Sequence, residues 1–345
     1  MSISVDPWLV MVFFNRTVKD APRPLTFNLL RLLADGGFHS GEAMAVQLGL
    51  SRASVHNALQ DVGEYGLDLH RVRGRGYRLG RPLHWLDAAA IKKQLAEAGG
   101  VVQLDILDHA TSTNAILLQR AALGAPSGGV LAAEWQSAGR GRLGRAWHAG
   151  LGDALTFSLL WRFECGLGAL SGLSLAVGVA VLRALHELGV HDVTLKWPND
   201  ILLAGDKLAG ILLEAQGDML GPSAVVIGIG LNLAVSEAAR AAIDQPVGDL
   251  AAAGVPLTER NRVLGLLLKH LLRVLDEFTA HGFGALRTEW ERNHAFQQRD
   301  VKLALADGTQ VTGQVRGVTD EGALRVETAE GEQVFHAGEI SLRSR

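Results

Sequence analysis

The sequence predicts a multidomain α+β protein in three parts: an N-terminal winged helix-turn-helix, a central α+β domain built on a mixed sheet, and a small C-terminal β-barrel. Near the N-terminus, two short helix patterns joined by a glycine turn precede a basic hairpin pattern. The middle of the chain has several strand patterns with few helices between them. The tail alternates apolar and polar residues between glycine-containing turns. The length of 345 residues also exceeds what one domain usually takes.

Composition limits the function and the compartment. The net charge of -3 excludes a globally basic nucleic-acid binder, so any DNA contact must come from a local patch. The one cysteine, Cys165, excludes a disulfide framework and a cysteine-rich zinc site, and it favours a reducing compartment, so we expect a cytoplasmic protein. No apolar run reaches the ~18 residues of a membrane span, and residues 8–14 lack the flanks of a signal peptide. We therefore expect no membrane contact.

Residues 1–20 are expected to form an N-terminal extension, either a flexible segment or a stretch upstream of an alternative start at Met11. Residues 21–82 are predicted to form the winged helix-turn-helix domain. An apolar helix face at 27–33 ends at a glycine pair, and Ser40 then caps a second helix. Gly49 makes a tight turn, after which Ser51 caps a third helix.

A basic hairpin completes this domain. Residues 69–79 alternate around Gly74-Arg75-Gly76, and five arginines lie between Arg71 and Arg81, a local charge typical of phosphate contacts. The alternative is a protein-interaction module with a solvated basic hairpin; the helix outline and the charge together favour DNA. The residues expected to contact DNA are Ser51, Arg52, Ser54, His56 and Asn57 on the third helix, and Arg73 and Arg75 in the hairpin.

Residues 83–295 are predicted to form the central domain. Its most distinctive stretch is a loop at residues 136–147, in which three glycines and three arginines alternate within seven residues. Glycine allows close approach of the backbone to a ligand, and arginine fits a carboxylate or a phosphate. The spacing Gly139-x-Gly141-x-x-Gly144 also matches the dinucleotide fingerprint, but a strand pattern and not a helix follows it, which excludes a Rossmann unit. Taken alone, the loop would be better explained as a mobile basic surface loop.

Four other motifs carry polar groups. Ser112-Thr113-Asn114 precedes a helix pattern and could cap it or bind a small polar ligand. Residues 196–200, Lys-Trp-Pro-Asn-Asp, form a rigid turn that presents Lys196, Asn199 and Asp200 together. Lys207 opens the next strand pattern, where lysine often only guards an edge. Glycines in the strand pattern at 225–233 imply close backbone approach, and Asn232 at its end could be a turn residue.

These five motifs together resemble those of the biotin–protein ligases, in the same order and at family-like spacing, although each alone is weak. Residues 38–42 and the Gly-Arg-Gly-Tyr hairpin resemble the N-terminal domain of the bifunctional members, which also repress the biotin operon. Residues 338–343 are similar to that family's SH3-like C-terminal domain, predicted at 296–345. The resemblance covers residues 25–345.

The resemblance implies a two-step reaction. Biotin is activated with ATP and Mg²⁺ to biotinyl-5′-AMP and diphosphate, and biotin is then transferred to one lysine of a biotin carboxyl carrier protein, a subunit of acetyl-CoA carboxylase. It also implies an adenylate-bound homodimer that represses at operator DNA. The alternatives are a ligase without a repressor role, a lipoate ligase with the same catalytic fold, and a non-enzymatic transcription factor that senses a small molecule.

By matched position, the resemblance also implies a set of site residues. Fixed positive charge is needed where the carboxylate meets the α-phosphorus, and Arg140, Arg142 and Lys207 suit that catalytic role. The resemblance implies that Arg140 and Lys207 together hold the biotin carboxylate and phosphate region, and that Arg142 retains the adenylate. The loop departs from the enterobacterial members at Leu143, where they have a further arginine, so we expect weaker retention of the adenylate. No side-chain cluster for a metal is expected. The implied biotin-binding residues are Ser112, Thr113, Asn114, Gln136, Arg140 and Lys207, and the implied ATP- and adenylate-binding residues are Gly139, Gly141, Arg142, Gly144, Arg145, Trp147, Asn199, Asp200 and Asn232.

Overall fold

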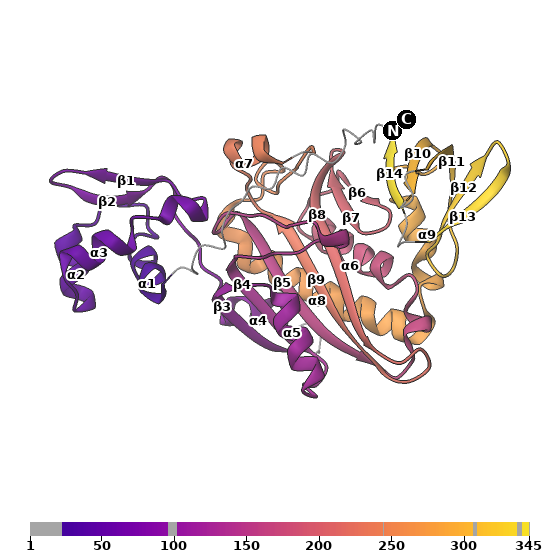
Figure 1. The fold of residues 1–345 in the computed structure, drawn as a ribbon, viewed down its shortest axis with the longest axis horizontal. Helices are drawn as coiled ribbons and strands as arrows, with labels where there is room; N and C mark the ends of the chain where they lie inside the picture. The colour runs from indigo at the N-terminus through magenta and orange to yellow at the C-terminus, as the bar shows by residue number, and fades with distance from the viewer. Residues whose placement is uncertain (1–22, 96–101, 244, 306–308, 337–339, 345) are drawn as a thin grey trace, which may run out of the picture.

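The computed structural model describes residues 23–95, 102–243, 245–305, 309–336 and 340–344. The predicted N-terminal extension, residues 1–20, lies outside them. Three parts follow one another along the long axis of the molecule in Figure 1: an N-terminal helical lobe, a large central sheet with its helices, and a set of C-terminal strands.

The N-terminal lobe has the predicted helix-turn-helix and hairpin. Ser40 Oγ accepts the backbone N–H groups of Glu42 and Ala43, and Ser51 Oγ accepts that of Ser54, so both predicted caps are confirmed. Gly49 ends the second helix with φ 66°, a left-handed conformation that glycine adopts without strain. The elements of this lobe are α1 (Pro24–Leu32), α2 (Gly41–Leu48), α3 (Arg52–Ala58), the 3-10 turn η1 (Val62–Tyr65), β1 (Leu69–Val72) and β2 (Gly76–Leu79).

The hairpin of β1 and β2 is attached to the segment that precedes α2. His39 and Tyr77 exchange backbone hydrogen bonds of 2.9 Å in both directions. A Cβ on Gly76 would lie 2.0 Å from the carbonyl oxygen of His39, so only glycine allows this contact. The two stretches that carry the N-terminal resemblance therefore form one unit.

The central domain is built on a mixed seven-stranded sheet in the order β3-β4-β5-β9-β8-β7-β6, as predicted. The pair β3 and β4 is parallel, and all other neighbours are antiparallel. The strands are β3 (Gln103–Ala110), β4 (Gly129–Gln136), β5 (Ala154–Phe163), β6 (Val193–Lys196), β7 (Asp200–Leu203), β8 (Asp206–Gly217) and β9 (Ser223–Asn232).

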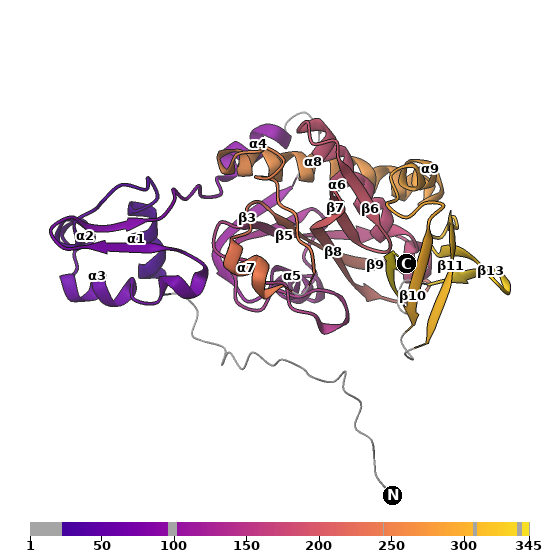
Figure 2. The same cartoon turned by 90° about the horizontal axis from the view of Figure 1, so that it is seen from above.

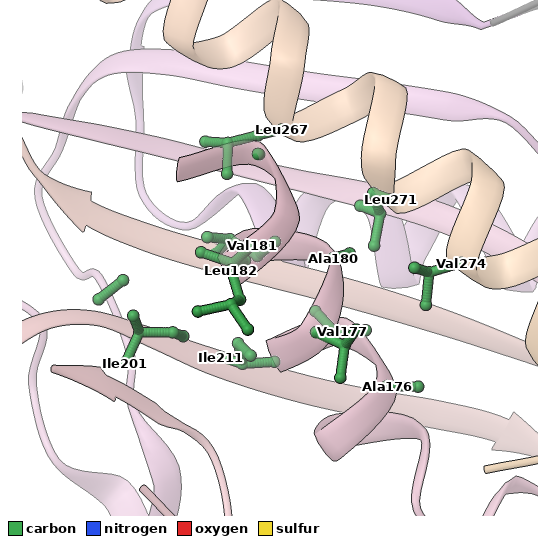
Figure 3. Packing of buried hydrophobic residues seen from close by; sticks show 14 of the residues in the cluster. Ala176, Val177, Ala180, Val181, Leu182, Ile201, Ile211, Leu267, Leu271 and Val274 are labelled. Carbon is green, nitrogen blue, oxygen red and sulfur yellow. The ribbon is translucent and has the colours of Figure 1, made fainter. Parts of the chain in front are cut away.

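Helices cover both faces of this sheet unequally. The helices α4 (Ala88–Leu95), α6 (Leu173–Glu187) and α8 (Arg260–His281) pack on one face and form the main core (Figures 2 and 3). Helix α5 (Thr113–Ala122) packs on the other face against β4, β5 and β9. Strand β5 alternates accordingly: Leu155, Phe157 and Leu159 enter the main core, and Ser158 lies on the α5 side. The second face is thus left partly open for a binding site.

The helical segment Leu167–Glu187, which includes α6, is long and apolar enough to cross a membrane by length and composition alone, although the sequence has no unbroken apolar run of that length. More than half of its most apolar window is buried in the fold. In Figure 3 its side chains Val177, Val181 and Leu182 lie among those of α8 and the sheet. It packs as the core helix of the central domain.

The C-terminal part is an antiparallel sheet in the order β13-β12-β11-β10-β14, which confirms the predicted strands. Within the described residues β13 and β14 are its edges, so closure into an SH3-like barrel stays a prediction. Helix α9 (Gly284–Arg292) leads into it, and residues 338–339 of the matching motif lie outside the described residues. The strands are β10 (Asp300–Leu305), β11 (Gln310–Val318), β12 (Leu324–Thr328), β13 (Gly331–Phe335) and β14 (Ile340–Ser344). Short α7 (Glu237–Ala242) precedes α8.

Candidate functional site

A cleft of about 830 Å³ opens on the α5 side of the central sheet. It brings together motifs that lie more than 100 residues apart, because the N-terminus of α5 and the ends of β4, β7, β8 and β9 meet there. The predicted site residues that line it are Ser112, Thr113, Asn114, Gln136, Arg140, Gly141, Arg142, Arg145, Trp147, Asn199, Asp200, Lys207 and Asn232.

Two strand glycines let side chains lie flat on the sheet. A Cβ on Gly230 of β9 would lie 2.5 Å from Cε2 of Trp147, and a Cβ on Gly228 would lie 2.2 Å from Oδ1 of Asn114. Any larger residue at either position would displace the side chain above it. The glycines of this strand predicted a close approach to its backbone, and the side chains of Trp147 and Asn114 make that approach.

One end of the cleft is a buried network of uncharged polar groups. The Thr113 N–H donates to Gln136 Oε1 over 2.8 Å, and Ser112 Oγ caps α5 by accepting the Ala115 N–H. Ser158 Oγ lies 2.7 Å from Thr113 Oγ1 and 2.5 Å from Asn114 Oδ1. Because these groups orient one another, they form a rigid polar wall that can satisfy a polar ring. We call this part of the cleft the amide end.

The other end holds charged groups. Lys207 Nζ lies 2.7 Å from Asp200 Oδ1, and Arg142 Nη1 donates to Asn199 Oδ1 over 3.2 Å. Burial lowers the pKa of the Arg142 guanidinium, whereas the charge of Asp200 raises it. The cleft thus places two cations beside one carboxylate and one amide, an arrangement suited to a strongly anionic ligand.

Arg140 lies toward the amide end and not beside Lys207. Its Nη2 lies 2.8 Å from Glu214 Oε2. A Cβ on Gly210 would lie 3.6 Å from Lys207 Nζ, and Glu214 is four residues further along β8, about 13 Å of extended strand. The two cations pair with different carboxylates, so a shared anion for Arg140 and Lys207 stays a prediction that this arrangement does not favour.

The glycine-arginine loop, residues 136–147, folds back on itself over the cleft. The Trp147 N–H donates to the Gly139 carbonyl over 2.8 Å, and the Gly141 N–H donates to that of Arg145 over 2.7 Å. Only one short turn, η3 (Arg142–Gly144), lies inside the loop, so no helix opens at the glycines and the rejection of a Rossmann unit is confirmed. Gly139 and Gly144 shape the loop without lining the cleft.

Asn232 has a local structural role in addition to its place in the cleft wall. Its amide nitrogen donates to the carbonyl oxygens of Lys207, over 3.3 Å, and of Gly248, over 3.0 Å. The bond to Lys207 fixes the start of β8. Asn232 therefore positions the backbone that carries the cleft's lysine.

Three residues that contact the site or line it escaped the sequence analysis. Glu214 and Ser158 bond to predicted site residues, and Phe296 reaches the cleft from the segment before β10. A period of two on β8 would have indicated Glu214, since Gly210, Leu212 and Glu214 share one face of the strand. A polar residue between apolar ones on β5 would likewise have indicated Ser158. No local signal marks Phe296.

The predicted DNA-contacting residues lie on α3 and the hairpin. Arg52, His56 and Asn57 are exposed on α3, whereas the hydroxyls of Ser51 and Ser54 bond each other over 2.9 Å at its start. In the hairpin Arg73 is exposed, and the Arg75 guanidinium lies 4.0 Å from the centroid of the Phe38 ring. Of the other arginines of the basic stripe, Arg71 donates to the Leu59 carbonyl and Arg81 pairs with Asp153. The Arg78 guanidinium lies 5.0 Å from the same Phe38 centroid, so four of the five arginines contact other residues of the protein.

Within the described ranges, no group of three or more His, Cys, Asp and Glu side chains is placed to hold a metal ion. Asp200, at the charged end of the cleft, is a carboxylate that could contribute to a metal site.

Comparison with known proteins assigns the three parts. The biotin/lipoate A/B protein ligase family matches residues 107–232, the biotin protein ligase C-terminal domain matches 299–343, and a helix-turn-helix domain matches 26–78. These matches define the class: a ligase domain that lies between a helix-turn-helix domain and a C-terminal domain found in biotin ligases. The chain belongs to the family of the bifunctional ligase/repressor BirA.

The similarity to known proteins extends over most of the chain. The bifunctional ligase/repressor BirA of Salmonella typhimurium is 40% identical over 328 residues, which cover 95% of this chain and 99% of that protein. The biotin–[acetyl-CoA-carboxylase] ligase of Mycobacterium tuberculosis is 37% identical and covers 74% of this chain and 95% of its own length. Among solved structures, the biotin protein ligase from Aquifex aeolicus in complex with biotin and ATP has a TM-score of 0.60 and 29% identity, and covers 70% of this chain and 99% of its own.

Proposed function

We propose that this protein activates biotin with ATP and transfers the biotinyl group to a lysine of a biotin carboxyl carrier protein. In the first step a biotin carboxylate oxygen attacks the α-phosphorus of ATP. The bond between the α-phosphorus and the oxygen that bridges it to the β-phosphate breaks, and diphosphate leaves. In the second step the lysine amine attacks the acyl carbon of biotinyl-5′-AMP, AMP leaves and the amine loses a proton. The observation that carries this proposal is one cleft with an uncharged amide end and a cationic end.

The two ends suit the two ends of the substrate. Ser112, Thr113 and Gln136 are placed to bind the polar ureido ring, since a buried urea needs its donors and acceptors satisfied. Lys207 and Arg142 are placed to stabilise charge at the α-phosphate, because fixed cations in a partly dry cleft lower the barrier most where negative charge concentrates. Trp147 would pack on the adenine, and Asp200 with the ATP phosphates would hold Mg²⁺.

The loop also protects the intermediate. An acyl-adenylate hydrolyses in water, and the glycine-arginine loop covers the cleft from Arg140 to Trp147. Arg142, Arg145 and the glycines would retain the adenylate there. The two-ended cleft and the match to the biotin ligase C-terminal domain favour biotin over lipoate.

Biotin-dependent exchange of labelled diphosphate into ATP tests this function, with lipoate as the parallel acid. Exchange with biotin alone is the expected result. We expect Lys207→Gln to reduce the exchange rate about 100-fold or more, since it removes a charge from the reacting centre. Leu123→Ala, a change at an exposed position outside the cleft, is the control. Exchange by Lys207→Gln at the wild-type rate would contradict the role given to this lysine.

We further propose that the protein represses biotin-synthesis genes from the cytoplasm as an adenylate-bound homodimer that binds operator DNA. A helix-turn-helix match at 26–78, ahead of the ligase match at 107–232 and the C-terminal match at 299–343, supports this reading, as does the exposure of Arg52, Asn57 and Arg73. Footprinting on the promoter region of the organism's biotin genes, with and without biotin and ATP, separates the repressor from a ligase with no DNA role. Protection only with both substrates is expected.

A further inference from the structure

Glu214, which the proposed reaction does not use, joins the glycine-arginine loop to the wall of the cleft. Its Oε2 accepts from Arg140 Nη2 over 2.8 Å and from Asn114 Nδ2 over 2.9 Å. Arg140 belongs to the loop, whereas Asn114 belongs to the first turn of α5. One carboxylate oxygen therefore connects the loop, which lines the cleft, with a helix that packs on the central sheet.

The wall side of this connection is rigid. Asn114 is 4% exposed, its Nδ2 also donates to the Leu212 carbonyl over 3.3 Å, and its Oδ1 lies 2.5 Å from Ser158 Oγ. Because Gly228 has no side chain, the side-chain amide of Asn114 can occupy the space above it. Every polar atom of the Asn114 side chain is thus held, so Asn114 fixes the position of the Glu214 carboxylate.

The loop side is weaker and can open. The Arg140 side chain is 45% exposed and that of Glu214 24% exposed, so water screens their attraction. A charge pair at this exposure changes an equilibrium by up to about fivefold, which suits a contact that must break and re-form in each turnover. The pair also lies at the amide end, away from the carboxylate of Asp200.

We propose that Glu214 is a positioning residue that latches the glycine-arginine loop over the amide end of the cleft through Arg140. This inference rests on the proposed ligase function. The latch biases the loop toward its closed position before substrate arrives, and it slows loss of the adenylate afterwards. Glu214 acts through Arg140 and does not touch the reacting atoms.

Cleavage by trypsin can report on the loop directly, because trypsin cleaves after arginine and the loop contains several arginines. In the full-length protein without substrates, we expect Glu214→Gln to increase cleavage after Arg142 and Arg145 about fivefold. Arg140→Gln breaks the same pair from the loop side and leaves the wall intact, so it should have the same effect. The double variant should be cut no faster than either single variant, because both changes remove one interaction. Glu164→Gln, the same change at an exposed residue directly after β5, should be cut at the wild-type rate.

A purely structural role of Glu214 in holding Asn114 predicts a different pattern. In that case Arg140→Gln would leave the cleavage rate unchanged, or the two effects would multiply in the double variant, and either result would overturn the latch. Cleavage of Glu214→Gln at the wild-type rate would overturn it as well. If Glu214→Gln folds poorly, the Arg140→Gln result decides alone.

A second readout separates the latch from the proposed function. With preformed biotinyl-5′-AMP, Glu214→Gln should release the adenylate about fivefold faster, while the exchange rate at saturating biotin and ATP stays within about twofold of wild type. If the wild-type protein shows no biotin-dependent exchange, the ligase proposal fails, and the trypsin result still reports on the latch. If exchange is present but release is unchanged, the latch fails alone.

Discussion

Single glycines decide how closely side chains lie on the sheet of the cleft. Trp147 lies on β9 because Gly230 has no side chain, and Asn114 sits on Gly228 for the same reason. Gly139 allows the loop to approach the Trp147 carbonyl, where a Cβ would come within 2.6 Å. At this scale the backbone, and not only the charged side chains, shapes the binding surface.

Gly230→Ala should displace the Trp147 indole from the sheet, because the added Cβ would lie 2.5 Å from Cε2. Overpacking of this kind costs about 1–3 kcal/mol, so we expect KM for ATP to increase about tenfold with a smaller change in KM for biotin. Diphosphate exchange at varied ATP and biotin measures both constants. Gly221→Ala, in the turn between β8 and β9, is the matched control. An unchanged KM for ATP would show that the indole does not contribute to nucleotide binding.

The segment that follows α9 joins the C-terminal strands to the central sheet. Leu195 of β6 exchanges backbone hydrogen bonds of 2.8 and 2.9 Å with Asn293 and Ala295, so this segment extends the edge of the central sheet. Between them His294 is buried and stacks on Trp290 at 4.4 Å between ring centroids. Trp197 Nε1 adds a bond of 3.0 Å to the Gly322 carbonyl. These contacts dock the C-terminal strands next to the cleft.

His294 should make this junction sensitive to acid. Burial lowers its pKa from 6.5 to about 4, so the unfolded chain binds the proton more readily than the folded one. The stability that depends on a neutral ring is fully present above pH 6.5 and is lost as the pH falls toward 4. Between pH 6.5 and pH 4, the protonation of His294 should therefore lower the free energy of unfolding by on the order of 3 kcal/mol.

Chemical denaturation of wild type and His294→Gln between pH 4 and 7 measures this effect. The free energy of unfolding should fall more steeply with decreasing pH in wild type than in the variant. His281→Gln, at an exposed position at the end of α8, should keep the wild-type slope. Parallel curves for wild type and His294→Gln would contradict the assignment.

At the scale of the whole molecule, the N-terminal lobe is held against the central domain by the segment that follows the loop. Leu151 is 1% exposed and packs in the core of the lobe, and its N–H donates to the Tyr65 carbonyl over 2.7 Å. Asp153 pairs with Arg81, and Arg31 of α1 pairs with Asp108 of β3. Leu151 therefore belongs in sequence to the predicted ligase domain and in packing to the helix-turn-helix lobe.

Leu151→Ala should loosen the lobe from the central domain. Truncation of a fully buried leucine costs about 2–5 kcal/mol. We expect thermal unfolding to separate into two transitions, with the amide protons of α1 to α3 exchanging faster than those of the central sheet. Leu123→Ala, at a position that is 88% exposed, is the control. A single transition at the wild-type temperature would mean that Leu151 does not hold the lobe in place.

The sequence by itself determined whatever depends on residues close to one another in the chain. The caps at Ser40 and Ser51, the hairpin around Gly74 and the failure of residues 139–144 to begin a helix follow from local chemistry. The order of the five motifs was enough to identify the family. The mixed sheet could be predicted as a class, because its strand patterns follow one another with few helices between them.

Only the tertiary structure decided which of these residues meet. Glu214 lies 74 residues from Arg140 and 100 from Asn114, and the register of β8 against β9 places it between them. The same geometry separates Arg140 from Lys207, although the family resemblance implied that both hold the biotin carboxylate and phosphate region. Leu151, an ordinary apolar residue in the sequence, becomes the contact between two domains. Period and capping act over a few residues, whereas pairing across a sheet and docking of domains depend on register and burial, which no short stretch of sequence contains.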